Sequence, residues 1–178
     1  MSDAHEPQTA RSGKAPMLED VALAVATVRR SRFEAGDRVA VLGLNGAGIA
    51  AVRFAHHLGA GRIDCVDDGR ASLDTASALG ASPRTALAYA QWVRDNPTEL
   101  PRRLLVFAPS PGLFELAVNA ADRRGVIVVV ARAAPERATI PDYYLNMIMK
   151  ETAIIGIDAP LGAEQQEAEA LLRSGWER

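Results

Sequence analysis

Residues 43–48 have the clearest chemical signature in the sequence. They form the series Gly-Leu-Asn-Gly-Ala-Gly and follow the apolar run VAVL at 39–42, which predicts a buried strand. A Gly-x-Gly-x-x-Gly series between a strand and a helix is typical of dinucleotide binding, because the amides at a helix N-terminus attract the pyrophosphate. The candidate cofactor-binding residues of this loop are Gly43, Leu44, Asn45, Gly46, Ala47 and Gly48.

Asn45 departs from this pattern, because it stands where the second glycine is expected. The first glycine makes the tight turn, the second lets the backbone approach the pyrophosphate, and the third lets the helix pack on the strand. Gly43 and Gly48 keep the first and third roles. Asparagine tolerates left-handed backbone, so we expect the turn to persist. We expect its side chain to occupy space near the phosphates, at a cost of about 1 to 3 kcal/mol in binding.

Two acids, Asp67 and Asp68, end the next strand-like run, RIDCVDD at 62–68. A carboxylate at Asp67 would accept both hydroxyls of a ribose and repel a 2′-phosphate, which favours NAD over NADP. The alternative is that the two acids cap the helix expected over 70–80. Arg70 is close enough along the chain to pair with either acid.

Other polar residues point less clearly to chemistry, and the sequence assigns no catalytic residue. His56 and His57 are expected at the C-terminal end of a helix, where a positive imidazole favours the helix dipole. Ser110 follows a strand, but no histidine is placed to activate it. Tyr143 or Tyr144 could donate a proton near the crevice, or could pack in the core or in a dimer.

Strand-like and helix-like segments alternate along the chain. Near-continuous apolar runs predict strands at 39–43, 62–68, 104–108, 126–131 and 152–157. Apolar residues at helical spacing predict helices at 17–33, 70–80, 113–124, 141–151 and 163–175, and a further helix directly after the glycine loop. Residues 81–103 are ambiguous, since TALAY could be a strand or the start of a helix. The alternation predicts an α/β Rossmann fold, with a doubly wound six-stranded parallel sheet and helices on both faces.

The composition is that of an ordinary globular chain. Its 178 residues carry a net charge of −2, and the arginines are scattered, so we expect neither nucleic-acid nor membrane binding. Cys65 is the only cysteine, which favours a reducing, cytoplasmic location, and the chain has too few suitable ligands for us to expect a metal site. Residues 1–16 are polar, so we expect a disordered tail followed by one Rossmann-like domain over 17–178.

Residues 17–175 resemble the coenzyme-binding half of the medium-chain dehydrogenase/reductase family. The matching segments include AGDRVAVLGLNGAGIAAVRFAHHLGA, RIDCVD and KETAIIGID, in this order along the chain. The resemblance implies binding of NAD(H) and oxidoreductase activity on a small alcohol or carbonyl compound bound in the crevice. It also implies a homodimer, in which strand Thr152–Ile157 pairs with its copy across a two-fold axis.

The chain also departs from this family. Only some 38 residues precede the first predicted strand, where members of the family carry a GroES-like catalytic domain with zinc ligands or a substrate pocket. We therefore expect a truncated, stand-alone protein that is not a zinc alcohol dehydrogenase. Ala131-Arg132 replaces a glycine of the family pattern, and the loop at 109–112 is rich in proline. Two alternatives remain open: a non-redox isomerase, cyclase or lyase that reuses the crevice without nicotinamide, and a non-catalytic dimeric subunit.

Overall fold

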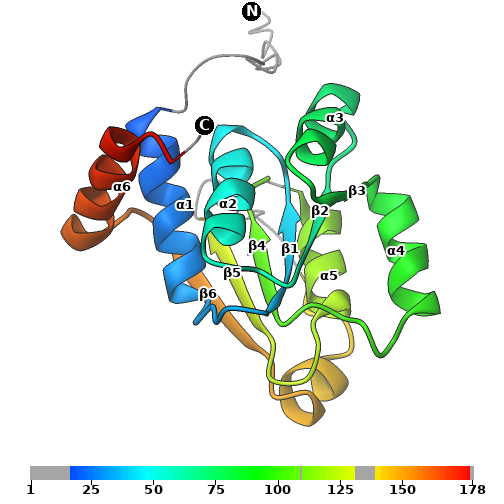
Figure 1. Ribbon diagram of the computed structural model, residues 1–178. Helices are drawn as coiled ribbons and strands as arrows, with labels where there is room; N and C mark the ends of the chain where they lie inside the picture. The colour runs from blue at the N-terminus through cyan, green and yellow to red at the C-terminus, as the bar shows by residue number, and fades with distance from the viewer. Residues whose placement is uncertain (1–16, 109, 131–138, 177–178) are drawn as a thin grey trace, which may run out of the picture.

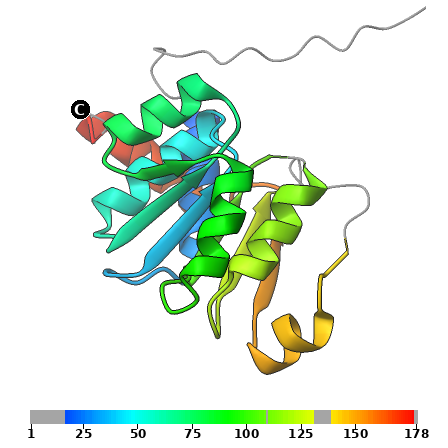
Figure 2. The same cartoon turned by 90° about the vertical axis from the view of Figure 1, so that its right-hand side faces the viewer.

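Six short runs of the chain form a single parallel sheet in the computed structural model, which describes residues 17–108, 110–130 and 139–176 (Figures 1 and 2). The strand order is β3-β2-β1-β4-β5-β6, which is the order of a Rossmann fold and confirms the predicted fold class. The strands are β1 (Arg38–Leu42), β2 (Arg62–Val66), β3 (Ser82–Arg84), β4 (Arg103–Val106), β5 (Val126–Val130) and β6 (Ala153–Ile157).

Helices cover both faces of this sheet. On one face lie α1, α2 and α6, and on the other lie α4 and α5, while α3 packs beside β2 and β3 (Figure 1). None of the helices within the described residues is long and apolar enough to span a membrane. The helices are α1 (Leu18–Arg30), α2 (Gly46–His57), α3 (Arg70–Ala78), α4 (Ala86–Asp95), α5 (Pro111–Ala120), the π-helix η2 (Tyr144–Met149) and α6 (Gly162–Ser174).

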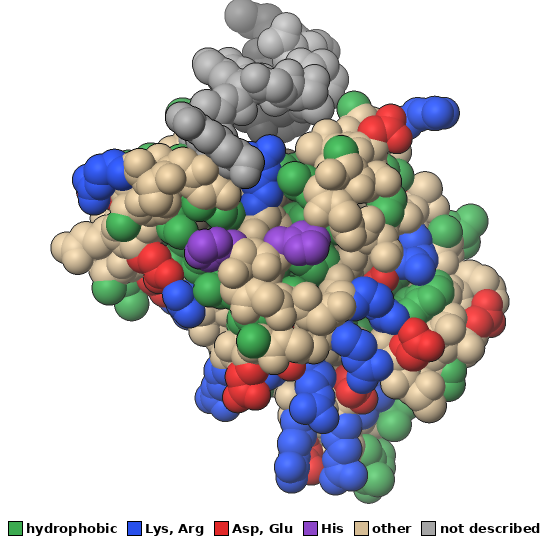
Figure 3. Space-filling model, viewed as in Figure 1, with side chains coloured by type: hydrophobic (Ala, Val, Ile, Leu, Met, Phe, Trp, Pro, Cys, Tyr) green, Lys and Arg blue, Asp and Glu red, His purple; other side chains and the backbone are tan. Residues whose placement is uncertain are grey.

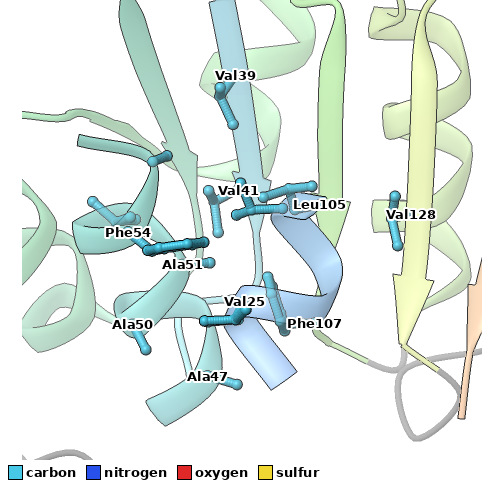
Figure 4. Packing of buried hydrophobic residues seen from close by; sticks show 14 of the residues in the cluster. Val25, Val39, Val41, Ala47, Ala50, Ala51, Phe54, Leu105, Phe107 and Val128 are labelled. Carbon is cyan, nitrogen blue, oxygen red and sulfur yellow. The ribbon is translucent and has the colours of Figure 1, made fainter. Parts of the chain in front are cut away.

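The core consists of two apolar layers, one on each face of the sheet. Alternate residues of a strand point to opposite faces, so Val41 belongs to one layer and Leu42 to the other. Figure 4 shows the first layer, where Val25 of α1 and Phe54 of α2 face the central strands. Because both faces are covered, the central strands read as continuous apolar runs, which is why the sequence pattern identified them.

The ambiguous stretch at 81–103 contains both a strand and a helix. TALAY belongs to the start of α4, so the helix interpretation is right and the strand interpretation is wrong. The strand of this stretch is β3, Ser82–Arg84, which the pattern does not predict because its three residues, Ser-Pro-Arg, include no apolar run. β3 pairs with β2 at one edge of the sheet.

Residues 141–151 do not form the regular helix that the sequence predicts. Only the six-residue π-helix η2 forms there. The Asp142 carboxylate accepts a hydrogen bond from the Leu145 amide at 3.1 Å, and the buried Asn146 side chain donates to the Pro141 carbonyl at 2.6 Å. These side-chain bonds fix a short turn before β6. The expected disordered tail, residues 1–16, lies outside the described part of the chain.

Candidate functional site

The glycine loop lies at the carboxyl ends of the central strands. β1 ends at Leu42 and leads through the loop into α2, while β4, the neighbour of β1, ends beside it at Val106. The connections on either side of this strand pair run in opposite directions across the sheet. In open α/β sheets, ligands bind outside the carboxyl ends of the strands at such a switch point.

Gly43 and Gly48 have the structural roles that the sequence predicts for them. Gly43 has a φ of +89°, and a Cβ there would lie 2.5 Å from the Cβ of Ala108 after β4. A Cβ on Gly48 would overlap the carbonyl oxygen of Gly43. Both positions therefore need glycine, the first for the turn and the third for the close approach of α2 to the loop.

Asn45 is the N-cap of α2. Its φ of −69° and ψ of −174° are extended, so the turn persists, as expected, without left-handed backbone at this position. Its side-chain oxygen accepts a hydrogen bond from the Gly48 amide at 3.0 Å, and its side-chain nitrogen donates to the Phe107 carbonyl at 3.0 Å. Asparagine is a favoured N-cap. The side chain therefore ties the start of α2 to the end of β4.

The first two amides of α2, those of Gly46 and Ala47, have no hydrogen-bond partner among the described residues. The first turn of any helix has amides without intrahelical partners, and they attract anions. Gly46 is exposed, whereas Ala47 and Leu44 are buried. The loop thus offers an exposed backbone donor at Gly46 and buried apolar side chains at Leu44 and Ala47.

Asp67 lies against the same loop. One oxygen of its carboxylate accepts from the Leu44 amide at 2.7 Å, and the other accepts from the Gly69 amide at 2.7 Å. Gly69 is the N-cap residue of α3, so this second bond supports the start of α3. Each carboxylate oxygen can accept a further hydrogen bond. Asp67 is half-buried, so its position leaves it able to bind a hydroxyl-bearing ligand.

Asp68 and Arg70 have other partners. The Asp68 carboxylate accepts from the Ala86 amide at 3.2 Å and so supports α4 rather than α3. Arg70 is almost fully exposed, and among the described residues it pairs with Asp74 at 4.0 Å. Arg70 is close enough along the chain to pair with Asp67 or Asp68, but it lies beside Asp74 instead.

Asp20, in the first turn of α1, is a charged neighbour of the loop that the sequence pattern did not reveal. A Cβ built on Gly46 would lie 2.8 Å from its Cγ and would overlap one of its carboxylate oxygens. Burial, and then the nearby Glu19 carboxylate, raise the pKa of Asp20. The contact joins residues 26 positions apart, and only the packing of α1 on α2 creates it.

The remaining candidates lie away from the loop or have structural partners. Figure 3 shows two histidine side chains at the surface, and His56 and His57 are exposed in the last turn of α2, as expected. The Ser110 hydroxyl accepts from the Leu113 amide at 3.4 Å and is the N-cap of α5. η2 and the two tyrosines before and within it directly precede the start of β6. They therefore lie at the amino-terminal edge of the parallel sheet, and the idea of a tyrosine near the crevice is wrong.

Across residues 17–108, 110–130 and 139–176, no cluster of three or more His, Cys, Asp or Glu side chains could hold a metal ion. Cys65 is fully buried in β2, where burial raises the pKa of its thiol to about 12. The site at the loop therefore consists of backbone amides and carboxylates.

Solved structures that this chain resembles include alcohol dehydrogenases. An alcohol dehydrogenase from Thermus sp. ATN1 is 23% identical with a TM-score of 0.79, and the match covers 88% of this chain and 46% of that one. The alcohol dehydrogenase of the hyperthermophilic archaeon Aeropyrum pernix is 20% identical with a TM-score of 0.78, and the match covers 91% and 47%. AibC is 26% identical with a TM-score of 0.75, covering 89% and 45%.

This chain has the fold of the coenzyme-binding half of zinc-type alcohol dehydrogenases. The chain spans less than half the length of the structures it matches. No protein-family model and no curated protein matches the sequence. The likeness therefore establishes the dehydrogenase-like fold, and the activity has to be argued from the loop and its neighbours.

Proposed function

We propose that this protein binds NAD(H) at the glycine loop and acts as an oxidoreductase on a small alcohol or carbonyl compound. The observation that carries the proposal is the position of Asp67. Its carboxylate is held against the loop by the Leu44 amide, at the end of β2 and beside the N-terminus of α2. In Rossmann dehydrogenases, an acid at this point of the fold binds the ribose hydroxyls.

The residues present fit a dinucleotide in three respects. Gly43 and Gly48 form the tight turn and the close helix packing that the loop requires. The amides of Gly46 and Ala47 would donate to the pyrophosphate. Asp67 would accept the ribose hydroxyls and would repel a 2′-phosphate, so NAD(H) is favoured over NADP(H).

The cofactor would supply the hydride chemistry, and the chain would bind and orient it. Asn45 limits the fit, because a glycine there would leave more room for the pyrophosphate. Its side chain is held by Gly48 and Phe107, which fixes it at the start of α2. We therefore expect weaker binding than in a loop with three glycines.

Calorimetric titration of the protein with NAD, NADH, NADP and NADPH tests this proposal. We expect saturable binding of NAD or NADH, weaker binding of the phosphorylated forms, and loss of binding in Asp67→Ala. Asp74→Ala is the matched control, since it removes an exposed carboxylate of α3 whose partner is Arg70. Equal affinity for NAD and NADP, or unchanged binding in Asp67→Ala, would contradict the assigned role of Asp67.

A second function is a non-redox reaction on another small ligand in the same crevice. The observation in its favour is Asp20, whose carboxylate lies against Gly46, where a dinucleotide would place its pyrophosphate. A ligand with fewer negative charges would meet less repulsion there. Absence of binding by all four nicotinamide nucleotides, with binding of an uncharged polyol or carbonyl compound, would favour this function.

We also propose that the protein forms a homodimer through β6. β6 is an edge strand, and its exposed backbone can pair with a second copy. Two of its residues, Ala153 and Gly156, are exposed, whereas the central strands are almost entirely buried. The turn before it adds large exposed apolar side chains, namely Tyr143, Tyr144, Leu145, Ile148 and Met149. Covering this apolar surface would stabilise the dimer.

A further inference from the structure

Asp20 reaches the start of α2 because Gly46 has no side chain. The ideal Cβ position of Gly46 lies 2.8 Å from Cγ of Asp20 and 3.1 Å from its Oδ1, and it overlaps Oδ2. Any larger residue at position 46 would displace the acid. The absence of a side chain at Gly46 therefore admits a carboxylate from α1 to the start of α2.

The carboxylate of Asp20 is not neutralised by the rest of the described chain. No hydrogen bond or ion pair joins it to another residue within 17–108, 110–130 or 139–176. Its charged neighbour on the same helix is Glu19, which is also an acid. Asp67, on the other side of the loop, adds a third carboxylate. The start of α2, whose amides would attract a pyrophosphate, thus has the Asp20 carboxylate against Gly46 and the Asp67 carboxylate against Leu44.

We infer that Asp20 is a specificity-determining residue that opposes anionic ligands at the loop. The inference rests on the proposed function, because it concerns the same site. A pyrophosphate bound to the amides of Gly46 and Ala47 would lie close to the Asp20 carboxylate. Like charges repel strongly at this range in a partly buried site. The chain therefore binds a dinucleotide less tightly than its loop geometry allows, and favours ligands with less charge at this point.

The test compares Asp20→Asn with the unmodified protein. The substitution removes the charge and keeps the size of the side chain. NAD and inorganic pyrophosphate are titrated separately by calorimetry. We expect Asp20→Asn to bind both ligands at least about tenfold more tightly, because the repulsion between like charges is removed. Glu19→Gln is the matched control, because it removes the same charge from an exposed neighbour, and we expect about a twofold change at most.

The two ligands separate this inference from the proposed function. If Asp20→Asn gains affinity for pyrophosphate while neither protein binds NAD, the role of Asp20 is supported and the proposed function fails. If both proteins bind NAD with equal affinity, the proposed function is supported and the role of Asp20 is overturned. An equal gain in Glu19→Gln would show a general effect of net charge and would also overturn it. Absence of pyrophosphate binding by every variant, together with unchanged NAD binding, would also overturn the role of Asp20.

Discussion

The two edges of the sheet differ in how their strands are protected. β3 is only three residues long, contains Pro83 and ends at Arg84, which pairs with Asp64 of β2. β6 is five residues long, apolar and partly exposed, and it follows a turn with exposed aromatic and aliphatic side chains. Short strands, proline and charge are the usual devices that prevent an edge from pairing with another chain. The comparison indicates that the β3 edge is closed to pairing and that the β6 edge is available for it.

A buried carboxylate stabilises the β3 edge of the sheet. Asp64 of β2 is fully buried and pairs with Arg84 of β3 at 2.7 Å and with Arg62 at 3.0 Å. Both guanidinium groups lie over the ring of Trp92 in α4, at 5.0 Å and 4.6 Å from its centroid. One carboxylate thus connects two strands and a helix, and the charges are paired rather than exposed to a partner.

Loss of the Asp64 carboxylate should have the largest effect. Asp64→Ala leaves two partly buried arginines without their shared partner, so we expect a loss of about 3 to 5 kcal/mol in the free energy of unfolding. Urea denaturation measures it. Asp74→Ala, which removes an exposed acid on α3, should change stability by no more than about 0.5 kcal/mol. A loss below about 1 kcal/mol in Asp64→Ala would show that the β3 edge does not depend on this cluster.

A lysine on β6 should break the proposed dimer. A Cβ at Gly156 meets nothing within 4 Å, so Gly156→Lys fits the monomer and places a charge on the edge strand. We expect sedimentation to show a dimer for the unmodified protein and a monomer for this variant, with unchanged circular dichroism. Gly162→Lys is the control, because that position in α6 is equally open. A monomeric unmodified protein, or a dimer that survives Gly156→Lys, would contradict the difference between the edges.

Substitution of Asn45 in the glycine loop, which lies between the two edges, should have a moderate effect on stability and no effect on dimer formation. Asn45→Ala removes the N-cap of α2 and the bond to Phe107, so we expect a loss of about 1 kcal/mol. Asn45→Gly should cost only a few tenths of that, at roughly 0.3 kcal/mol. Urea denaturation measures both variants. Equal stability of Asn45→Ala and the unmodified protein would show that the cap contributes nothing.

The smallest effect is expected for the alkylation rate of Cys65, a buried residue of β2 that pairs with β3. Burial, and then the nearby Asp64 charge, raise the pKa of its thiol to about 12. At pH 8 the thiol is therefore protonated, and the reactive thiolate is scarce. We expect mass spectrometry to show slow alkylation by iodoacetamide in the folded protein and faster alkylation in Asp64→Ala. Rapid alkylation of the folded unmodified protein would show that this side opens readily.

Elements with a strong local pattern were predictable from the sequence. The central strands are continuous apolar runs, and Gly43 and Gly48 mark the turn by residue type alone. β3 was missed because its pairing with β2 depends on the fold and not on its own three residues. Asp20 was missed because its contact with Gly46 depends on how α1 packs on α2.

The contacts of Asn45 likewise could not be predicted from the local sequence. Its type signalled a departure from the glycine pattern, but both its extended backbone and its bond to Phe107 depend on the end of β4. Residues 141–151 were predicted as a helix because they are apolar at suitable spacing. The segment instead forms the short π-helix η2, with side-chain bonds that involve Asp142 and Pro141. Local spacing thus predicted the elements, while contacts between elements determined the site.

The most direct test of the account is a calorimetric titration of NADH into the unmodified protein and into Asp67→Ala. We predict saturable binding by the unmodified protein with a Kd below about 1 mM. Affinity should fall at least about tenfold in Asp67→Ala, which has no carboxylate against the loop. No binding by the unmodified protein at millimolar NADH, or equal binding by both proteins, would contradict it.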